Sequence, residues 1–128
     1  MTGLGIVLAH LVGDYVIQSH WMACEKTKRW WPAVAHGITY TLPYLLVTRS
    51  PWALLVIGGT HIVVDRYRLA RHVVWVKNQF APRGQYRPVE RTSTGYPLDT
   101  PPWMAVWLMI VADNTLHLAI NAAAVMWL

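Results

Sequence analysis

The sequence predicts an all-α, polytopic membrane protein in which four transmembrane helices form a bundle. Apolar residues make up 55% of the 128 residues and charged residues only 13%, whereas soluble domains carry about 25% charged residues. Four apolar segments have, or come close to, the ~20 residues that cross a bilayer. Seven of the eight tryptophans lie within a few residues of a segment end, as in the aromatic belt of membrane helices.

The expected spans cover residues 2–22, 32–48, 51–75 and 101–128, to within a few residues. Pro32, Pro51 and Pro101 or Pro102 stand where helices begin, because the first helical turn tolerates a missing backbone N–H. Pro43 lies inside the second span and predicts a kink there. We therefore expect one domain, residues 1–128, with a cytoplasmic loop at about residues 77–100 between the third and fourth helices.

Basic residues orient the predicted bundle. Ten of the eleven Lys and Arg residues lie after the first span or from the end of the third span onward, and these two regions face the same side of the membrane. The positive-inside rule makes this side cytoplasmic, so both termini are expected outside. Contact with the bilayer and its anionic headgroups then explains the net charge of +5, and no nucleic acid partner is expected. The ten residues are Lys26, Lys28, Arg29, Arg66, Arg68, Arg71, Lys77, Arg83, Arg87 and Arg91.

Three His/Asp pairs at helical i, i+4 spacing lie inside the apolar segments. They are His10 with Asp14, His61 with Asp65, and Asp113 with His117. An ionisable side chain in a membrane-length helix is costly, which makes it a candidate functional residue. The first and third spans read His then Asp, and the fourth, which runs in the opposite direction, reads Asp then His. Every aspartate is therefore expected nearer the cytoplasm, and the three pairs can face one site.

These residue types predict a divalent metal site. Imidazole nitrogens and carboxylate oxygens bind Zn²⁺ at about 2.0–2.2 Å, and i, i+4 spacing places two of them on one helix face. His36, on the second span, adds a further candidate. The set exceeds the four ligands of one tetrahedral zinc, so either two metal ions bind or some members orient the ligands. The candidate ligands are His10, Asp14, His36, His61, Asp65, Asp113 and His117.

Neighbouring residues support helices that converge on this site. Gly58 and Gly59 lie just before His61, and Gly13 follows His10, so that small residues would allow close backbone approach. Gln18, four residues after Asp14, is a candidate for orienting a ligand by a hydrogen bond. A polar network between helices and a proton or ion pathway are the alternatives to a metal site.

Four motifs also resemble one family. The chain contains AHLVGDYVIQSHWMACEK at residues 9–26, AHG at 35–37, HIVVDR at 61–66 and DNTLH at 113–117. Together they resemble the bacterial and phage membrane proteins described as domain of unknown function 3307. The resemblance covers nearly the whole chain except the loop, and it implies a multi-span protein of the bacterial inner membrane with an intramembrane His/Asp cluster. The matching positions are His10, Asp14, Gln18, His36, His61, Asp65, Asp113 and His117.

Two classes of function fit these features. The first is a metal-dependent hydrolase acting on a lipid or lipid-linked phosphodiester, in which the metal activates water and Asp113 or Asp14 acts as the base. The second is a non-enzymatic phage or bacterial membrane component with a structural metal site or polar network. An open coordination position favours the enzyme, and a site closed by helix packing favours the structural class. The sequence leaves open whether the chain is an enzyme and whether it forms a homo-oligomer.

Overall fold

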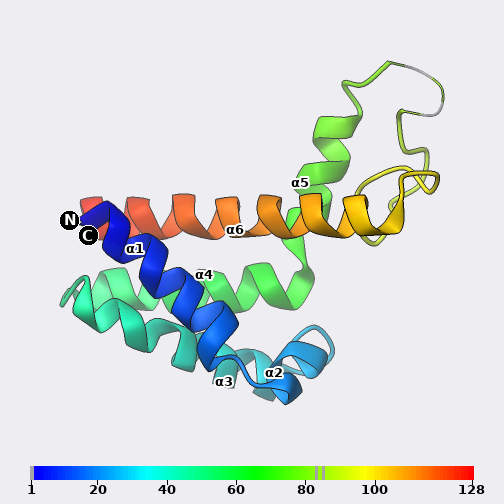
Figure 1. The fold of residues 1–128 in the computed structure, drawn as a ribbon. Helices are drawn as coiled ribbons and strands as arrows, with labels where there is room; N and C mark the ends of the chain where they lie inside the picture. Colours follow the sequence, from blue (N-terminus) through cyan, green and yellow to red (C-terminus); the bar gives the residue numbers. More distant parts are fainter. Residues whose placement is uncertain (1, 83, 85) are drawn as a thin grey trace. The chain divides into compact units, whose positions relative to one another are not determined.

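The computed structural model describes residues 2–82, 84 and 86–128 (Figure 1). In this part of the chain the regular elements are six α-helices, one π-helical segment and one 3₁₀ segment. Arg83, one of the ten basic residues above, lies outside the described residues. The chain divides into two compact units, the first formed by the residues up to Tyr67 together with His117–Leu128, and the second by Arg68–Leu116.

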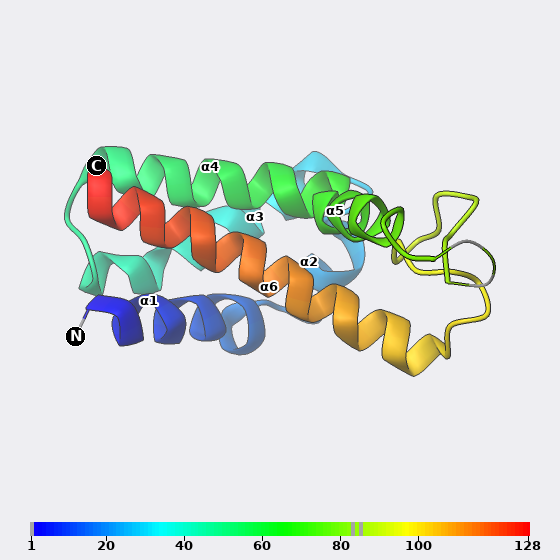
Figure 2. The same cartoon turned by 90° about the horizontal axis from the view of Figure 1, so that it is seen from above.

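The first unit is built from short helical segments. In chain order they are α1 (Thr2–Leu11), the π-helical η1 (Val12–Ile17), α2 (His20–Glu25), α3 (Trp30–Thr41), the 3₁₀ segment η2 (Leu42–Leu46), α4 (Pro51–Tyr67) and the last part of α6 (Pro102–Trp127). Helix α3 packs along α4, and η1 packs on α3. Helix α1 begins at the same end of this unit at which α6 stops (Figure 2).

Buried aromatic and aliphatic side chains form the core of the first unit. Tyr40 and Tyr44, from α3 and η2, are fully buried between α1 and α4, together with Ile6 and Ile57. Gly13 allows this packing, because a Cβ atom there would lie 2.6 Å from Tyr40 Cδ2 and 3.1 Å from the Tyr40 backbone oxygen. Segment η1 therefore lies directly on the backbone of α3.

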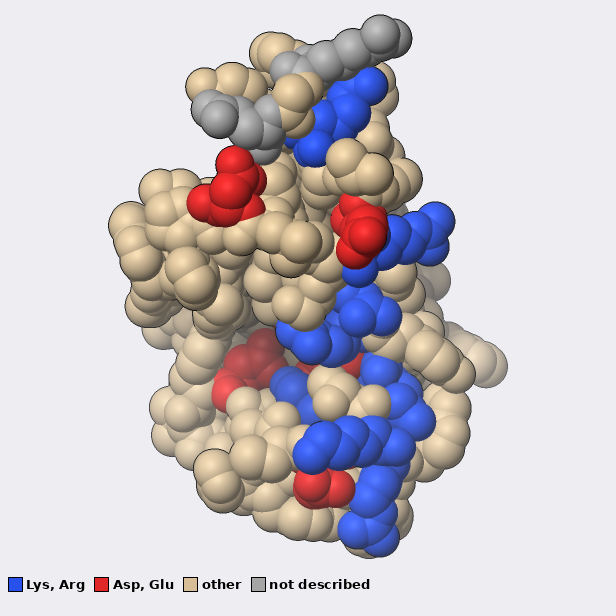
Figure 3. Space-filling model, turned by 90° about the vertical axis from the view of Figure 1, so that its right-hand side faces the viewer, with Lys and Arg blue, Asp and Glu red and all other residues tan. Residues whose placement is uncertain are grey.

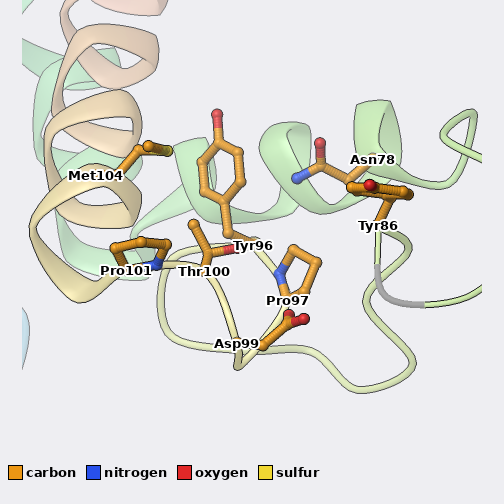
Figure 4. Close-up of a pocket in the computed structure, with 8 residues that line it drawn as sticks. All are labelled: Asn78, Tyr86, Tyr96, Pro97, Asp99, Thr100, Pro101 and Met104. Carbon is orange, nitrogen blue, oxygen red and sulfur yellow. The ribbon is translucent and has the colours of Figure 1, made fainter.

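The second unit contains α5 (Leu69–Asn78), the loop that follows it and the first part of α6. Hydrogen bonds tie this loop to α5: Trp75 Nε1 donates to the Glu90 backbone oxygen at 3.2 Å, and Asn78 Nδ2 donates to that of Gly95 at 2.9 Å. A pocket of about 410 Å³ lies between α5, the loop and the start of α6 (Figure 4). Tyr96 is among its lining residues, whereas none of the predicted metal ligands lines it.

The prediction of four membrane-spanning helices is wrong. Within the described residues only α6, with 26 residues, is long and apolar enough to cross a membrane. The first expected span is divided among α1, η1 and α2, because the backbone leaves the helical conformation at Gln18 and is extended at Ser19. The second passes from α3 into η2 at Leu42, next to Pro43. Arg68, with a left-handed φ of 52°, separates α4 from α5 and so divides the third.

Basic side chains are prominent on the surface. On the face drawn in Figure 3, Lys and Arg side chains gather in larger groups than Asp and Glu side chains do. This agrees with the eleven basic and six acidic residues of the sequence.

Gly13 provides a test of the packing of η1 on α3. We expect Gly13→Ala to lower the free energy of unfolding by about 1–3 kcal/mol, because the added methyl group overlaps the buried Tyr40 ring and backbone. The matched control is Gly59→Ala, because a Cβ at Gly59 meets nothing within 4 Å. The control is expected to be neutral or to stabilise the helix by up to about 1 kcal/mol. Chemical denaturation measures both, and equal stability of the two variants would contradict this packing.

Helix α6 provides a test of membrane insertion. Only 11% of its most apolar 18-residue window is buried, whereas the core helix of a soluble protein is mostly buried, and we propose that α6 enters a lipid bilayer. Wild-type protein should then stay in the membrane fraction after alkaline carbonate extraction. The exposed Val111 of α6 and the exposed Val89 of the loop form a matched pair. Val111→Lys should weaken retention, since a lysine in a bilayer costs about 3 kcal/mol or more, and Val89→Lys should not. Extraction of the wild type into the soluble fraction would reject insertion.

Candidate metal centre

Four side chains of the first unit bring one polar atom each to a common point. They are Asp14 from η1, His36 from α3, and His61 and Asp65 from α4. All four residues are buried, and their nitrogen and oxygen atoms lie within 4.8 Å of one another. This buried group of two imidazoles and two carboxylates, called the cluster below, could hold a metal ion.

The distances within the cluster are close to those of a tetrahedral site. His36 Nε2 lies 3.1 Å from Asp14 Oδ1 and 3.4 Å from Asp65 Oδ2. His61 Nε2 lies 3.3 Å from the same Asp14 oxygen and 3.2 Å from the same Asp65 oxygen. The two Nε2 atoms are 2.9 Å apart. Ligand atoms at about 2.0–2.1 Å from a tetrahedral zinc are about 3.3 Å from one another. The four nitrogen–oxygen distances are close to this value, and the distance between the two Nε2 atoms is shorter.

Local backbone features bring these side chains together. Asp14 lies in the π-helical segment η1, a conformation that is frequent at functional sites because it redirects side chains within a helix. His61 and Asp65 are one turn apart on α4 and share a face. Gly58, one turn before His61, would place a Cβ atom 2.6 Å from Thr41 Oγ1 of α3, so glycine allows α3 and α4 to approach closely here.

Hydrogen bonds keep both carboxylates ionised. Burial alone would raise the pKa of Asp14, but hydrogen bonds from His36 and His61 outweigh it and hold that pKa well below its usual value. Burial likewise opposes ionisation of Asp65, and hydrogen bonds from His117, His36 and His61 lower its pKa nevertheless. Burial acts against the charged form of His36, but its hydrogen bonds to Asp14 and Asp65 raise its pKa. The cluster therefore attracts positive charge.

His117 of α6 lies behind two members of the cluster. Its Nδ1 atom is 3.2 Å from His61 Nδ1, and its Nε2 atom is 3.1 Å from Asp65 Oδ1. His61 Nδ1–H can thus donate to His117, while His117 Nε2–H donates to Asp65. If a metal ion takes the place of the hydrogen bonds that His61 Nε2 makes to Asp14 and Asp65, this assignment leaves the lone pair of His61 Nε2 and the other oxygen of Asp65 for the ion, as in metal sites whose ligands are held by outer hydrogen bonds.

A second hydrogen-bonded group lies behind Asp14 and His61. The Tyr40 ring stacks on the His61 ring, with centroids 3.5 Å apart and planes at 11°. The Tyr40 hydroxyl lies 2.8 Å from His10 Nδ1 and accepts a hydrogen bond of 2.6 Å from Asn121 Nδ2. His10 Nδ1 in turn lies 3.5 Å from Asp14 Oδ2. Tyr40 therefore fixes the plane of His61 and the position of His10.

An ammonium group borders the cluster. Lys26, which follows α2, places its Nζ atom 2.5 Å from Asp65 Oδ2 and 2.6 Å from Gln18 Oε1. Gln18 Nε2 donates to the backbone oxygen of Asp14 at 3.1 Å. Gln18, predicted to orient a ligand, thus contacts the Asp14 backbone and the lysine that pairs with Asp65, and its orienting role stays a prediction.

The seven predicted ligands occupy three kinds of position. Four form the cluster, and His10 and His117 lie one step outside it, each near a cluster carboxylate. Asp113 belongs to the part of α6 counted with the second unit and is half-buried. The roles of Asp14 and Asp113 as catalytic bases stay predictions.

Three contributing residues were not predicted: Tyr40, Asn121 and Lys26. A tyrosine within an apolar helix is usual in a protein core, so residue type alone did not distinguish Tyr40. A signal did exist for Asn121, because it lies four residues after His117 and so shares its helix face. Lys26 was counted among the residues that set topology, although it ends the first motif, which also contains His10, Asp14 and Gln18.

Comparison with known proteins gives a family without an activity. No curated protein and no solved structure matches this chain. The sequence pattern of one family, described as "Protein of unknown function (DUF3307)", matches residues 4–127, which is nearly the whole chain and includes every member of the cluster. The chain therefore belongs to the DUF3307 family.

Proposed function

We propose that this protein is a metal-binding protein whose cluster holds one divalent transition-metal ion, Zn²⁺ being the simplest choice. The observation that carries the proposal is the set of five nitrogen–oxygen and nitrogen–nitrogen distances of 2.9–3.4 Å among four buried side chains. Two imidazoles and two carboxylates form a common donor set for zinc, and their combined charge with a divalent ion is zero. Buried neutral sites avoid the free-energy cost of an uncompensated charge.

The burial of the ligands favours a structural role for the metal. Asp14 and Asp65 are 8% and 7% exposed, and His36 and His61 are fully buried. A hydrolytic site needs an open coordination position that water and substrate can reach, and such burial argues against one. A metal bound here would instead join η1, α3 and α4. A hydrolase acting on a lipid phosphodiester is therefore the less favoured of the two classes.

Metal content and thermal stability test this proposal together. Purified protein should bind one Zn²⁺ per chain, and a hundredfold excess of free Zn²⁺ over Kd should stabilise it by about 2.7 kcal/mol, or roughly 10 °C in Tm. Chelation should reverse the shift. His61→Ala should abolish binding, whereas His20→Ala should not, because His20 is exposed on α2. Equal zinc content in the two variants would reject the cluster as the site.

A structural metal and a catalytic metal differ in what their removal does to the packing. Any ion that binds only the folded state raises Tm, so a shift in Tm alone does not separate the two roles. If the ion joins η1, α3 and α4, chelation well below Tm should speed hydrogen exchange in these segments. Unchanged exchange after the metal is removed would reject the structural role, and hydrolysis of lipid phosphodiesters becomes the hypothesis to assay.

The position of His117 behind the ligands gives a graded prediction. His117→Phe keeps an aromatic ring at this position but removes the hydrogen bonds of His117 to His61 and Asp65. We expect zinc to bind with unchanged stoichiometry and about 10–100-fold more weakly, the usual effect of removing a group that orients metal ligands. Competition with a chromophoric chelator measures this affinity, with His20→Phe as the control. Complete loss of binding would instead make His117 a ligand, and an unchanged Kd would remove its orienting role.

A further inference from the structure

The ammonium of Lys26 contacts the same Asp65 oxygen that a metal ion in the cluster would bind. Lys26 Nζ lies 2.5 Å from Asp65 Oδ2. The same oxygen is 3.2 Å from His61 Nε2 and 3.4 Å from His36 Nε2, so it is the Asp65 atom that faces the common point. The Lys26 side chain is only 17% exposed, which means that water screens its charge poorly. A permanent positive charge thus lies beside the proposed metal position.

Contacts on both sides hold Lys26 in this place. Gln18 accepts a second hydrogen bond from the ammonium and is itself bound to the Asp14 backbone. The backbone that follows Lys26 is held by Arg66, whose guanidinium donates to the carbonyl oxygens of Thr27 and Lys28. Arg66 is the residue after Asp65, so the same end of α4 positions both the carboxylate and the segment that carries the ammonium. Lys26 is therefore a fixed part of the centre.

Charge determines what this arrangement does. Without a divalent ion, two buried carboxylates require a counter-ion, and the ammonium provides one positive charge at Asp65. With a divalent ion bound, the four ligands already neutralise the metal, and the ammonium becomes a like charge a few ångströms away. Like charges at such a distance repel each other strongly where water is excluded. The ammonium and the metal also compete for the lone pairs of one oxygen.

We propose that Lys26 is a built-in counter-ion that competes with the metal for Asp65 and so lowers the affinity of the site. This inference rests on the metal site proposed above. Metal entry separates the ammonium from the lone pair that the metal takes, and metal release restores the contact. The Lys26 side chain, at 17%, is also more exposed than those of the cluster, which are 10% exposed or less, so it borders the cluster on a side that solvent reaches. The site is accordingly one that exchanges its metal with the surroundings.

Zinc affinities of four proteins test the proposal: wild type, Lys26→Met, Lys26→Arg and Lys28→Met. Lys26→Met keeps the side-chain length and removes the charge, and it should bind Zn²⁺ about tenfold or more tightly, an effect of the size that neighbours of metal ligands have. Lys26→Arg keeps the charge and should stay close to wild type. Lys28→Met is the matched control, because Lys28 pairs with Glu25 and its side chain is 65% exposed. Its affinity should not change.

Thermal denaturation without metal gives an independent readout. Lys26→Met should lower the Tm of the chelated protein, because Asp14 and Asp65 lose a counter-ion, and should widen the difference between the Tm values with and without Zn²⁺. If Lys26→Met does not fold, Lys26→Gln makes the same comparison with a neutral hydrogen-bond donor.

The outcomes separate this inference from the proposed function. Zinc binding by the wild type with an equal or weaker affinity in Lys26→Met overturns the competition and leaves the metal site standing. Tighter binding by Lys28→Met as well would assign the effect to general surface charge and overturn the specific role of Lys26. Absence of zinc binding by all four proteins rejects the metal site and, with it, this inference.

Discussion

Two ionised carboxylates buried in one small volume are the constraint on which the first unit depends. Asp14 and Asp65 have lost most of their water, and an ionised carboxylate without compensation in such surroundings costs several kcal/mol or more. The compensation comes from different parts of the chain: imidazoles on α3, α4 and α6, and the ammonium that follows α2. None of these segments can be displaced without exposing or unpairing a charge. Packing and electrostatics thus constrain the same backbone positions.

This constraint explains why the helices are short and irregular. Asp14 lies in a π-helical segment, and the backbone leaves the helical conformation at Gln18 before α2 brings Lys26 back to Asp65. A straight helix through residues 2–22 would carry Lys26 away from Asp65, since it rises about 1.5 Å per residue. The apolar composition of this stretch indicated helix correctly but contained no signal for these breaks. They are set by contacts with residues 22 to 39 positions away in the sequence, which is why the spans were overestimated.

For the site, too, local sequence patterns were informative and contacts between distant residues could not be predicted. Helical spacing was sufficient to predict that His61 and Asp65 share a face, and the recurrence of such pairs, with His36 added, identified the residues that converge. Spacing could not separate the metal ligands from the residues that hydrogen-bond to them among the seven candidates, because that difference depends on how each side chain is oriented. His117 turns both of its nitrogens toward His61 and Asp65, and His10 Nδ1 contacts the Tyr40 hydroxyl, whereas His61 Nε2 faces both cluster carboxylates. Such roles depend on partners from other helices.

A buried metal site with a fixed ammonium beside it has a consequence for stability. A ligand that binds only the folded state stabilises it by RT ln(1 + [L]/Kd), so the contribution of the metal depends on how the free metal concentration compares with Kd. A site of very high affinity is filled at every metal level, so the metal-free packing is never populated. Because Lys26 lowers the affinity, it moves Kd toward free metal concentrations at which the site is only partly occupied. The stability of the packing among η1, α3 and α4 then depends on the metal supply. Because Arg66 and Gln18 fix the ammonium, that dependence is built into the same backbone that holds the ligands.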